Sequence, residues 1–267
     1  MIDRAAGRPD AVKRGLALEF EQKIVLAALL AMAALAWAWL IYSARQMHVP
    51  VMASAGMAGA MPGLPPAAYL ASTLLMWVLM MVAMMGPSVV PMVLHYARFG
   101  ASAGERHAIR HSLIFALCYL LIWTGFAVLA ALIQTAFLDS DLIGRMARAI
   151  GSDKLAIFLL AMAALYQFSP IKRACLAQCR SPQAFLTHYW RPGPGAAIRL
   201  GLVHGAHCLG CCWLLMLLLF VGGVMNLGWA ALLSLIVISE KCAPPRLHAE
   251  RWIAGLCVLA ALALILL

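Results

Sequence analysis

Residues 201–213 have the clearest capacity for chemistry, because they place ionisable side chains in an apolar segment long enough to cross a membrane. Their sequence is Gly-Leu-Val-His-Gly-Ala-His-Cys-Leu-Gly-Cys-Cys-Trp. On a helix, His204 and Cys208 lie one turn apart and share a face with Cys211 or Cys212. Ionisable groups at membrane depth are costly and usually mark a functional site. Imidazole and thiolate suit Cu(I) or zinc, so we predict a metal site formed by His204, His207, Cys208, Cys211 and Cys212.

A second apolar segment, residues 76–92, is unusually rich in methionine. Thioether sulfur is a good ligand for Cu(I) and a poor one for hard ions or zinc, so these methionines favour copper. Methionine also fills irregular gaps in protein cores, but a depth similar to that of the cysteines favours a ligand role here. We predict that two antiparallel helices form an intramembrane Cu(I) site, with thioether ligands from Met80, Met81, Met84 and Met85.

Further sulfur groups flank this predicted site. Cys175 and Cys179 stand four positions apart on the predicted cytoplasmic side. Together with two of the methionines they form a candidate metal relay, which consists of Met76, Met92, Cys175 and Cys179. The predicted outer loop carries another group, which fits either copper collection or a flexible linker, and consists of Met47, His48, Met52, Met57 and Met61.

Two other classes of function stay open. In a membrane thiol–disulfide oxidoreductase, the vicinal pair Cys211/Cys212 and the pair Cys175/Cys179 would cycle between thiol and disulfide, although the methionines would then have no role. In a structural subunit of a membrane complex, both clusters would be packing residues. The sequence has neither an H-E-x-x-H metalloprotease motif nor a G-x-x-x-x-G-K-[ST] nucleotide-binding loop, and we expect a protein that is not an enzyme.

The composition indicates an all-α, polytopic membrane protein. The chain of 267 residues is 65% hydrophobic and 11% charged, whereas soluble chains average about 25% charged residues. The net charge of +10 is better explained by basic cytoplasmic loops than by a nucleic-acid partner, since no basic stripe with interleaved aromatic residues is present.

Seven apolar segments are candidates for membrane spans: residues 24–42, 67–96, 112–137, 155–168, 198–221, 226–239 and 252–267. The fourth is short for a span. We expect residues 1–23 to form a basic cytoplasmic tail and residues 24–267 to form a single helical membrane domain in the lipid bilayer. The predicted metal-binding core covers about residues 76–241.

The basic residues predict the orientation of these spans. With the N-terminus inside and the C-terminus outside, the outer segments hold only Arg45, Arg145, Arg148 and Lys154. The remaining sixteen of the 20 lysines and arginines then lie on the cytoplasmic side. Cytoplasmic loops collect such residues, so this pattern favours the N-in, C-out arrangement.

Other residues are predicted to shape the helices rather than to bind metal. Pro87 and Pro91 free backbone carbonyls and bend a membrane helix, which is tolerated where neighbouring helices cover the defect. Gly201 and Gly205 thin a helix and let a neighbour approach closely. Glu240 and Lys241 are expected to form a neutralising pair at the end of the sixth span.

The chain resembles a bacterial family of predicted metal-binding integral membrane proteins, formerly a domain of unknown function. One member of that family is a membrane copper chaperone associated with a tyrosinase. The resemblance rests on the Met-Met-x-x-Met-Met-x-Pro run and the Cys-Leu-Gly-Cys-Cys-Trp core, and the matching segments are residues 80–91, 166–172, 175, 179–182, 201–213, 225–226 and 240–241. It implies a multi-pass protein of the bacterial inner membrane that delivers Cu(I) to a copper-requiring client enzyme.

Overall fold

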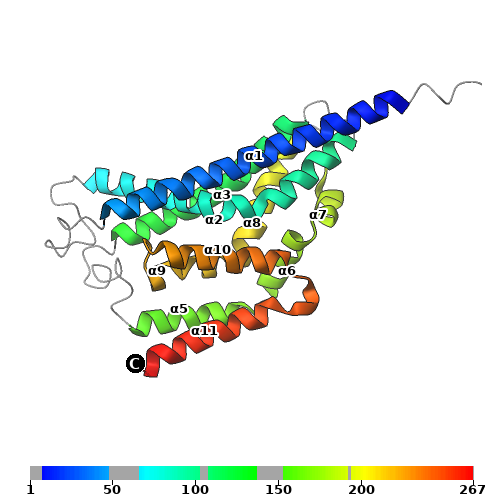
Figure 1. Ribbon diagram of the computed structural model, residues 1–267. Coiled ribbons are helices and arrows are strands. Elements are labelled where there is room, and N and C mark those ends of the chain that lie inside the picture. The colour runs from blue at the N-terminus through cyan, green and yellow to red at the C-terminus, as the bar shows by residue number, and fades with distance from the viewer. Residues whose placement is uncertain (1–7, 48–65, 103–107, 137–152, 192–193, 267) are drawn as a thin grey trace, which may run out of the picture.

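The computed structural model in Figure 1 describes residues 8–47, 66–102, 108–136, 153–191 and 194–266. Regular structure in these ranges is entirely helical, which confirms the all-α prediction. The helices are α1 (Arg8–Met47), α2 (Pro66–Ser102), α3 (Ala108–Ala136), α5 (Asp153–Tyr166), α6 (Pro170–Arg180), α7 (Pro182–Tyr189), α8 (Pro194–Leu217), α9 (Leu219–Gly222), α10 (Leu227–Cys242) and α11 (Ala249–Leu266). A short 3₁₀ helix, Pro245–Leu247, precedes α11. Most of the outer Met/His loop, residues 48–65, lies outside the described residues.

Among the described residues, five segments are long and apolar enough to cross a membrane: Gln22–Arg45, Ala67–Gly100, Ile109–Ala136, Gly195–Gly222 and Ala249–Leu266. A sixth candidate joins α5 to α6 across a bend of 65°. Helix α10 has 16 residues, or roughly 24 Å at the usual helical rise, which is less than the thickness of about 30 Å of a bilayer's hydrocarbon core. The prediction of membrane-length helices is therefore confirmed for five segments, while the count of seven stays a prediction.

The long helices run back and forth along one common direction (Figure 1). The N-terminal end of α1 and the C-terminal end of α11 lie at opposite ends of this bundle. We call the end that carries α6 and α7 the α6 end. These two short helices occupy much of the polar segment between the predicted spans 155–168 and 198–221.

Helix α3 lies at the centre of the packing that positions the site. It packs extensively against α2 on one side and against α8 on another, whereas α1 covers α2. Helices α5 and α11 pack mainly against each other and form a separate pair at one side of the bundle (Figure 1). The largest fully buried side chains include Trp77, Trp123 and Tyr119, all on α2 or α3.

At Pro87, a neighbouring helix covers the gap in the hydrogen bonding of α2. Pro87 has no N–H, so the carbonyl of Ala83, four residues earlier, lacks its helical donor. The indole Nε1 of Trp37 on α1 donates to this carbonyl at 3.0 Å. This hydrogen bond confirms that a neighbouring helix covers the defect, as the sequence led us to expect.

Small residues on α8 allow the close approach of α3, as predicted. A Cβ added to Gly201 would clash with the backbone carbonyl of Phe115, and one added to Gly205 would lie 2.9 Å from a side-chain carbon of Ile122. After α9, Gly223 adopts a φ of 91°, a left-handed conformation that favours glycine. This turn directs the chain into α10, where Asn226 caps the helix by accepting a hydrogen bond from the Trp229 amide.

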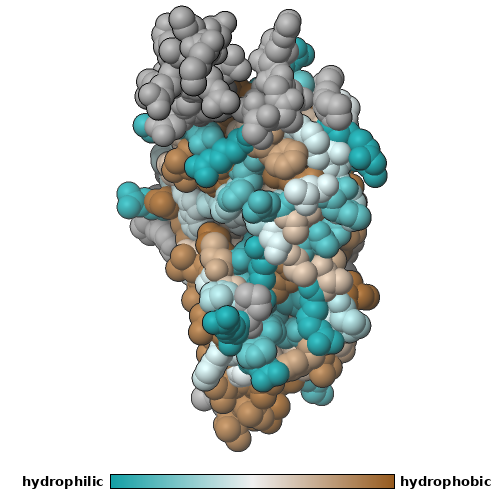
Figure 2. Space-filling model, turned by 90° about the vertical axis from the view of Figure 1, so that its right-hand side faces the viewer, coloured by the Kyte–Doolittle hydropathy of each residue, from teal (hydrophilic) through white to brown (hydrophobic). Residues whose placement is uncertain are grey.

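Figure 2 looks onto the α6 end and shows hydrophilic residues gathered across much of it, with hydrophobic residues along the flanks. The basic residues at the helix ends here include Arg98, Arg110, Lys172, Arg180, Arg199, Lys241 and Arg251. The flanks carry large exposed apolar side chains such as Leu35, Leu165 and Leu259. An apolar flank with a polar, basic end is the surface expected of a helical bundle that lies in a membrane.

Candidate metal centre

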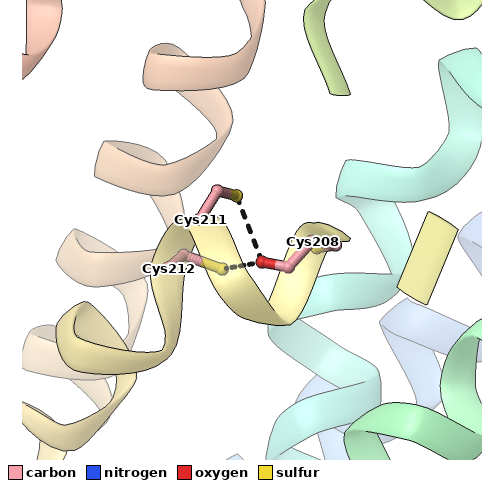
Figure 3. A group of neighbouring side chains, drawn as sticks. All are labelled: Cys208, Cys211 and Cys212. Carbon is pink, nitrogen blue, oxygen red and sulfur yellow. Dashed lines mark hydrogen bonds between the residues drawn. The ribbon is translucent and has the colours of Figure 1, made fainter. Parts of the chain in front are cut away.

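Three cysteines of α8 form a compact, fully buried cluster. The Sγ atoms of Cys208, Cys211 and Cys212 all lie within 4.8 Å of one another. The thiols of Cys211 and Cys212 both donate to the backbone carbonyl of Cys208, at 3.1 and 3.0 Å (Figure 3). The spacing of three and four residues places these groups on one face of the helix, as the sequence predicted. Three thiols at this separation could converge on one metal ion after small rotations of their side chains.

Polar groups from three other helices surround the sulfur of Cys208. The Nζ of Lys241 on α10 donates to Cys208 Sγ at 2.9 Å. The hydroxyl of Tyr119 on α3 lies 3.0 Å from the same sulfur. Ser88 on α2 connects these two groups, since its Oγ lies 2.9 Å from Lys241 Nζ and 3.1 Å from Tyr119 Oη. A cation next to a thiol stabilises the thiolate, which is the form that binds metal.

The two predicted histidine ligands differ in their surroundings. His204 is buried among aromatic rings, with centroid distances of 5.6 Å to Tyr119 and 5.4 Å to Phe185. Within the described part of the chain, its Nδ1 has no hydrogen-bond partner. His207 is half-buried, faces the aromatic side chains of α7, and donates through Nδ1 to the carbonyl of Val203 at 2.7 Å. Neither histidine belongs to the compact group of thiols.

The four predicted methionine ligands on α2 are all buried. Met80, Met81, Met84 and Met85 each have an exposed fraction of 1% or less. Helices α2 and α8 each pack extensively against α3, and the Cu(I) site between α2 and α8 stays a prediction. The link that the structure does show runs through Met85, whose Sδ lies 4.0 Å from Ser88 Oγ and hence beside the Lys241–Cys208 contact.

The candidate relay residues separate into two groups. The Cys179 thiol interacts with the thiols of Cys208 and Cys211, so α6 brings a fourth cysteine to the edge of the cluster. Cys175 lies against α8 at Gly210, where an added Cβ would be 2.7 Å from Cys175 Sγ. Both cysteines are only half-buried. Met76 and Met92 lie on α2, where Met92 is buried and Met76 packs against the core.

A buried ion pair supports the cluster from the α6 end. Lys172 Nζ donates to Glu240 Oε2 at 2.8 Å and to the backbone carbonyl of Cys211 at 2.8 Å. Both side chains of the pair have an exposed fraction of 1%. The predicted pair between Glu240 and Lys241 is therefore wrong: adjacent residues on a helix point in different directions, and Glu240 faces α6 while Lys241 faces Cys208.

From the sequence we predicted no role for Ser88, Tyr119 or Lys172, and we predicted the wrong partner for Lys241. Ser88 and Tyr119 carried no distinguishing signal, because serine and tyrosine are common in membrane helices. Lys172 and Lys241 could have been recognised by their charge next to apolar segments, because a buried lysine needs a polar or acidic partner.

A comparison with protein families matches residues 74–265 to the model of the PpoB2 family, described as copper chaperone. The chain belongs to this family. The matched region contains the cysteine cluster, the methionine segment and the surrounding polar groups, and it extends to the end of α11. Neither a curated protein nor a solved structure matches the chain.

The donor atoms at the site fit the cargo that the family description indicates. Thiolate and thioether sulfur are soft ligands that select Cu(I). The cluster consists of three buried thiols, an unpartnered imidazole nitrogen lies one helical turn away, and a cation is in place beside one sulfur. The family and the cluster together indicate a protein that binds metal, with copper as the indicated metal.

Proposed function

We propose that this protein is a multi-pass membrane chaperone that binds Cu(I) at Cys208, Cys211 and Cys212 and passes it to a copper-requiring client. The observation that supports this most strongly is the group of three buried thiols within 4.8 Å, in a chain of the copper chaperone family. Cu(I) accepts two or three soft ligands and exchanges them readily, which suits transfer rather than permanent storage.

The polar groups around Cys208 have a defined role in this proposal. Two or three thiolates around one Cu(I) ion carry net negative charge, and such charge is costly in a buried site unless a cation offsets it. Lys241 supplies that cation at 2.9 Å from Cys208 Sγ. Tyr119 and Ser88 hold Lys241 and Cys208 in this arrangement through their hydroxyl groups.

The half-buried cysteines of α6 provide a route between the cluster and the α6 end. Cys179 lies near enough to interact electrostatically with the thiols of Cys208 and Cys211, so a Cu(I) ion can move between them by exchange of one sulfur ligand for another. On the other side of Cys208, Met85 and the deeper methionines Met84, Met81 and Met80 provide thioether sulfur further along α2. His204 is placed to replace a thiolate during such an exchange, whereas His207 lies toward α7.

We further propose that the protein lies in a bacterial inner membrane with its N-terminus inside and its C-terminus outside. The opposite positions of the two ends of the bundle support an odd number of crossings (Figure 1). The basic residues gathered at the α6 end support a cytoplasmic location of that end. In this orientation, the Cys179 route opens toward the cytoplasm.

The test of copper binding is a comparison of cysteine variants. The full chain, purified in detergent under reducing conditions and loaded with Cu(I), should retain about one copper ion per chain and little zinc, as soft ligands require. The triple variant C208S/C211S/C212S should lose this copper. The matched control is C118S/C242S/C257S, which removes three cysteines outside the cluster and should retain it. Equal copper content in the two variants would disprove the proposal.

A thiol–disulfide oxidoreductase is the second candidate, because Cys179 approaches the thiols of Cys208 and Cys211. All eight cysteines are free thiols in the structure. This function requires a disulfide to form and to exchange with a partner. It is favoured over copper transfer if a C179S or C211S variant traps a mixed disulfide with another membrane protein while copper binding is absent from the wild type.

A further inference from the structure

A cavity of about 610 Å³ opens at the α6 end, apart from the cysteine cluster. It lies between the turn that joins α5 to α6, helix α6 itself and the start of α11, and residues from these segments line it. Its polar lining includes Gln167, Lys172, Arg173, Arg180, His248 and Arg251. The copper site proposed above uses none of these side chains as a ligand.

The charge of this cavity is strongly positive. Four lining residues are lysine or arginine, and Glu250 is the single acidic one among the lining residues. Lys172 is already paired with Glu240, and Arg180 lies 3.5 Å from Glu250. Arg173 and Arg251 are exposed and, within the described ranges, have no acidic partner. Two guanidinium groups without an acidic partner at one cavity suit a phosphate group, because arginine binds phosphate through paired N–H donors.

A buried amide adds a second polar feature to the cavity. Gln167 has an exposed fraction of 1%, lines the cavity, and has no hydrogen-bond partner for its Oε1 within the described part of the chain. A buried amide oxygen without a partner is costly. Because rotation of the amide exchanges its oxygen and nitrogen, this side chain can present an N–H donor to an oxygen of a bound phosphate.

Exposed apolar side chains lie around the cavity, as a binding site for a lipid requires. Phe168, which lines the cavity, is 55% exposed, and Ile171 and Trp252 nearby in the sequence are 63% and 76% exposed. The outer faces of α5 and α11 continue this surface with Phe158, Leu165, Leu256 and Leu259. A soluble phosphate compound would have no use for an apolar rim, whereas acyl chains would cover it.

We propose that this cavity binds the phosphate headgroup of an anionic phospholipid, with the acyl chains along the outer faces of α5 and α11. Basic cavities between membrane helices on the cytoplasmic side are the usual sites for such headgroups. The proposal rests on the membrane placement given above but not on copper binding. Lys172 lines the cavity and also donates to the Cys211 carbonyl, so a bound headgroup would lie one side chain away from the cysteine cluster.

Native mass spectrometry of the full chain in detergent tests this site. The protein is titrated with phosphatidylglycerol and, separately, with phosphatidylcholine. We expect the wild type to bind phosphatidylglycerol at least about tenfold more tightly than phosphatidylcholine. The double variant R173Q/R251Q should bind phosphatidylglycerol about 30-fold more weakly than the wild type, because each basic side chain near an anionic headgroup contributes about a factor of five to the affinity. The variant R173K/R251K should bind more tightly than R173Q/R251Q but more weakly than the wild type, because lysine keeps the charge but lacks the paired N–H donors. The control R110Q/R199Q removes two exposed arginines at the same end but outside the cavity, and it should bind like the wild type.

The same titration contains the results that would overturn the proposal. Equal affinity for the two lipids, or unchanged binding by R173Q/R251Q, would exclude a headgroup site in this cavity. Displacement of phosphatidylglycerol by inorganic phosphate at equal concentration would assign the cavity to a free anion instead. The C208S/C211S/C212S variant should still bind phosphatidylglycerol, so a failure of the copper proposal leaves this result interpretable.

Discussion

At the scale of single residues, Cys208 is where the contacts of the site converge. Its sulfur contacts Lys241 and Tyr119, and its carbonyl accepts from the thiols of Cys211 and Cys212. The three cysteines were recognisable in the sequence because ionisable residues are rare at membrane depth. The residues that surround Cys208 were not, because they come from α2, α3 and α10, and only the packing of these helices brings them together.

Lys241 offers a direct test of how charge contributes to Cu(I) binding. Lys241→Met removes the cation beside Cys208 and should weaken Cu(I) binding by about tenfold or more, because the negative charge of the thiolate–copper complex would then lie unbalanced in a low-dielectric site. Lys241→Arg keeps the charge and should recover most of the affinity. Competition with a chromophoric Cu(I) chelator measures both variants, and an unchanged affinity in Lys241→Met would remove Lys241 from the site.

At the scale of helices, α3 is the element that determines the geometry of the site. The sequence predicted α2 and α8 as direct partners, because each carries sulfur at a similar depth. It could not show that α3 packs against both, since α3 has no cluster of its own that marks it as central. The close approach of α3 to α8 was predictable from Gly201 and Gly205, but glycine spacing does not identify which neighbour approaches.

The proline in α2 provides a prediction for the packing of α1 on α2. Trp37→Phe removes the indole N–H that satisfies the Ala83 carbonyl and should cost about 1 kcal/mol of stability. In a Pro87→Ala background the restored backbone N–H of residue 87 can satisfy the same carbonyl, so the cost of Trp37→Phe should become much smaller. Thermal stability measured by size-exclusion chromatography after heating tests the four combinations. Equal losses in the two backgrounds would contradict the account of this helix.

The predicted and observed helix boundaries agree for the long apolar segments and differ for the polar segment before α8. The expected span 67–96 and the helix Pro66–Ser102 agree because a long apolar run leaves little choice of structure. Helices α6 and α7 were not predicted, because the segment 171–197 is polar and contains Pro182, Pro192 and Pro194, so no apolar run marks a helix there. Both helices begin with a proline at the first helical position, where its missing N–H costs nothing, so proline here marks helix starts rather than a loop.

At the scale of the whole molecule, the distribution of basic residues and the positions of the two chain ends both fit the proposed orientation in the membrane. Basic residues gather at the α6 end, and the two ends of the chain lie at opposite ends of the bundle (Figure 1). Five segments have the length and composition of a membrane span, whereas α10 and α5 are shorter. Composition and charge predicted the class of protein, but hydropathy alone does not decide whether a helix of 14 or 16 residues crosses fully.

Reporter fusions to the C-terminus test the proposed orientation. Alkaline phosphatase is active only outside the cytoplasm, so a fusion after Leu267 should be active if the chain crosses an odd number of times from an inner N-terminus. A fusion truncated after Ser102, at the α6 end, should be inactive and should serve as the control. Activity in the second fusion and not in the first would reverse the orientation and place the Cys179 route on the outer side.

X-ray absorption at the copper edge of the loaded, purified protein shows whether thiolates of Cys208, Cys211 and Cys212 hold Cu(I). The structure predicts a Cu(I) edge and a first shell of sulfur atoms, because three thiols lie within 4.8 Å of one another. The C208S/C211S/C212S variant should lose this shell. A first shell of nitrogen or oxygen in the wild type, or a sulfur shell unchanged in the triple variant, would contradict the claim.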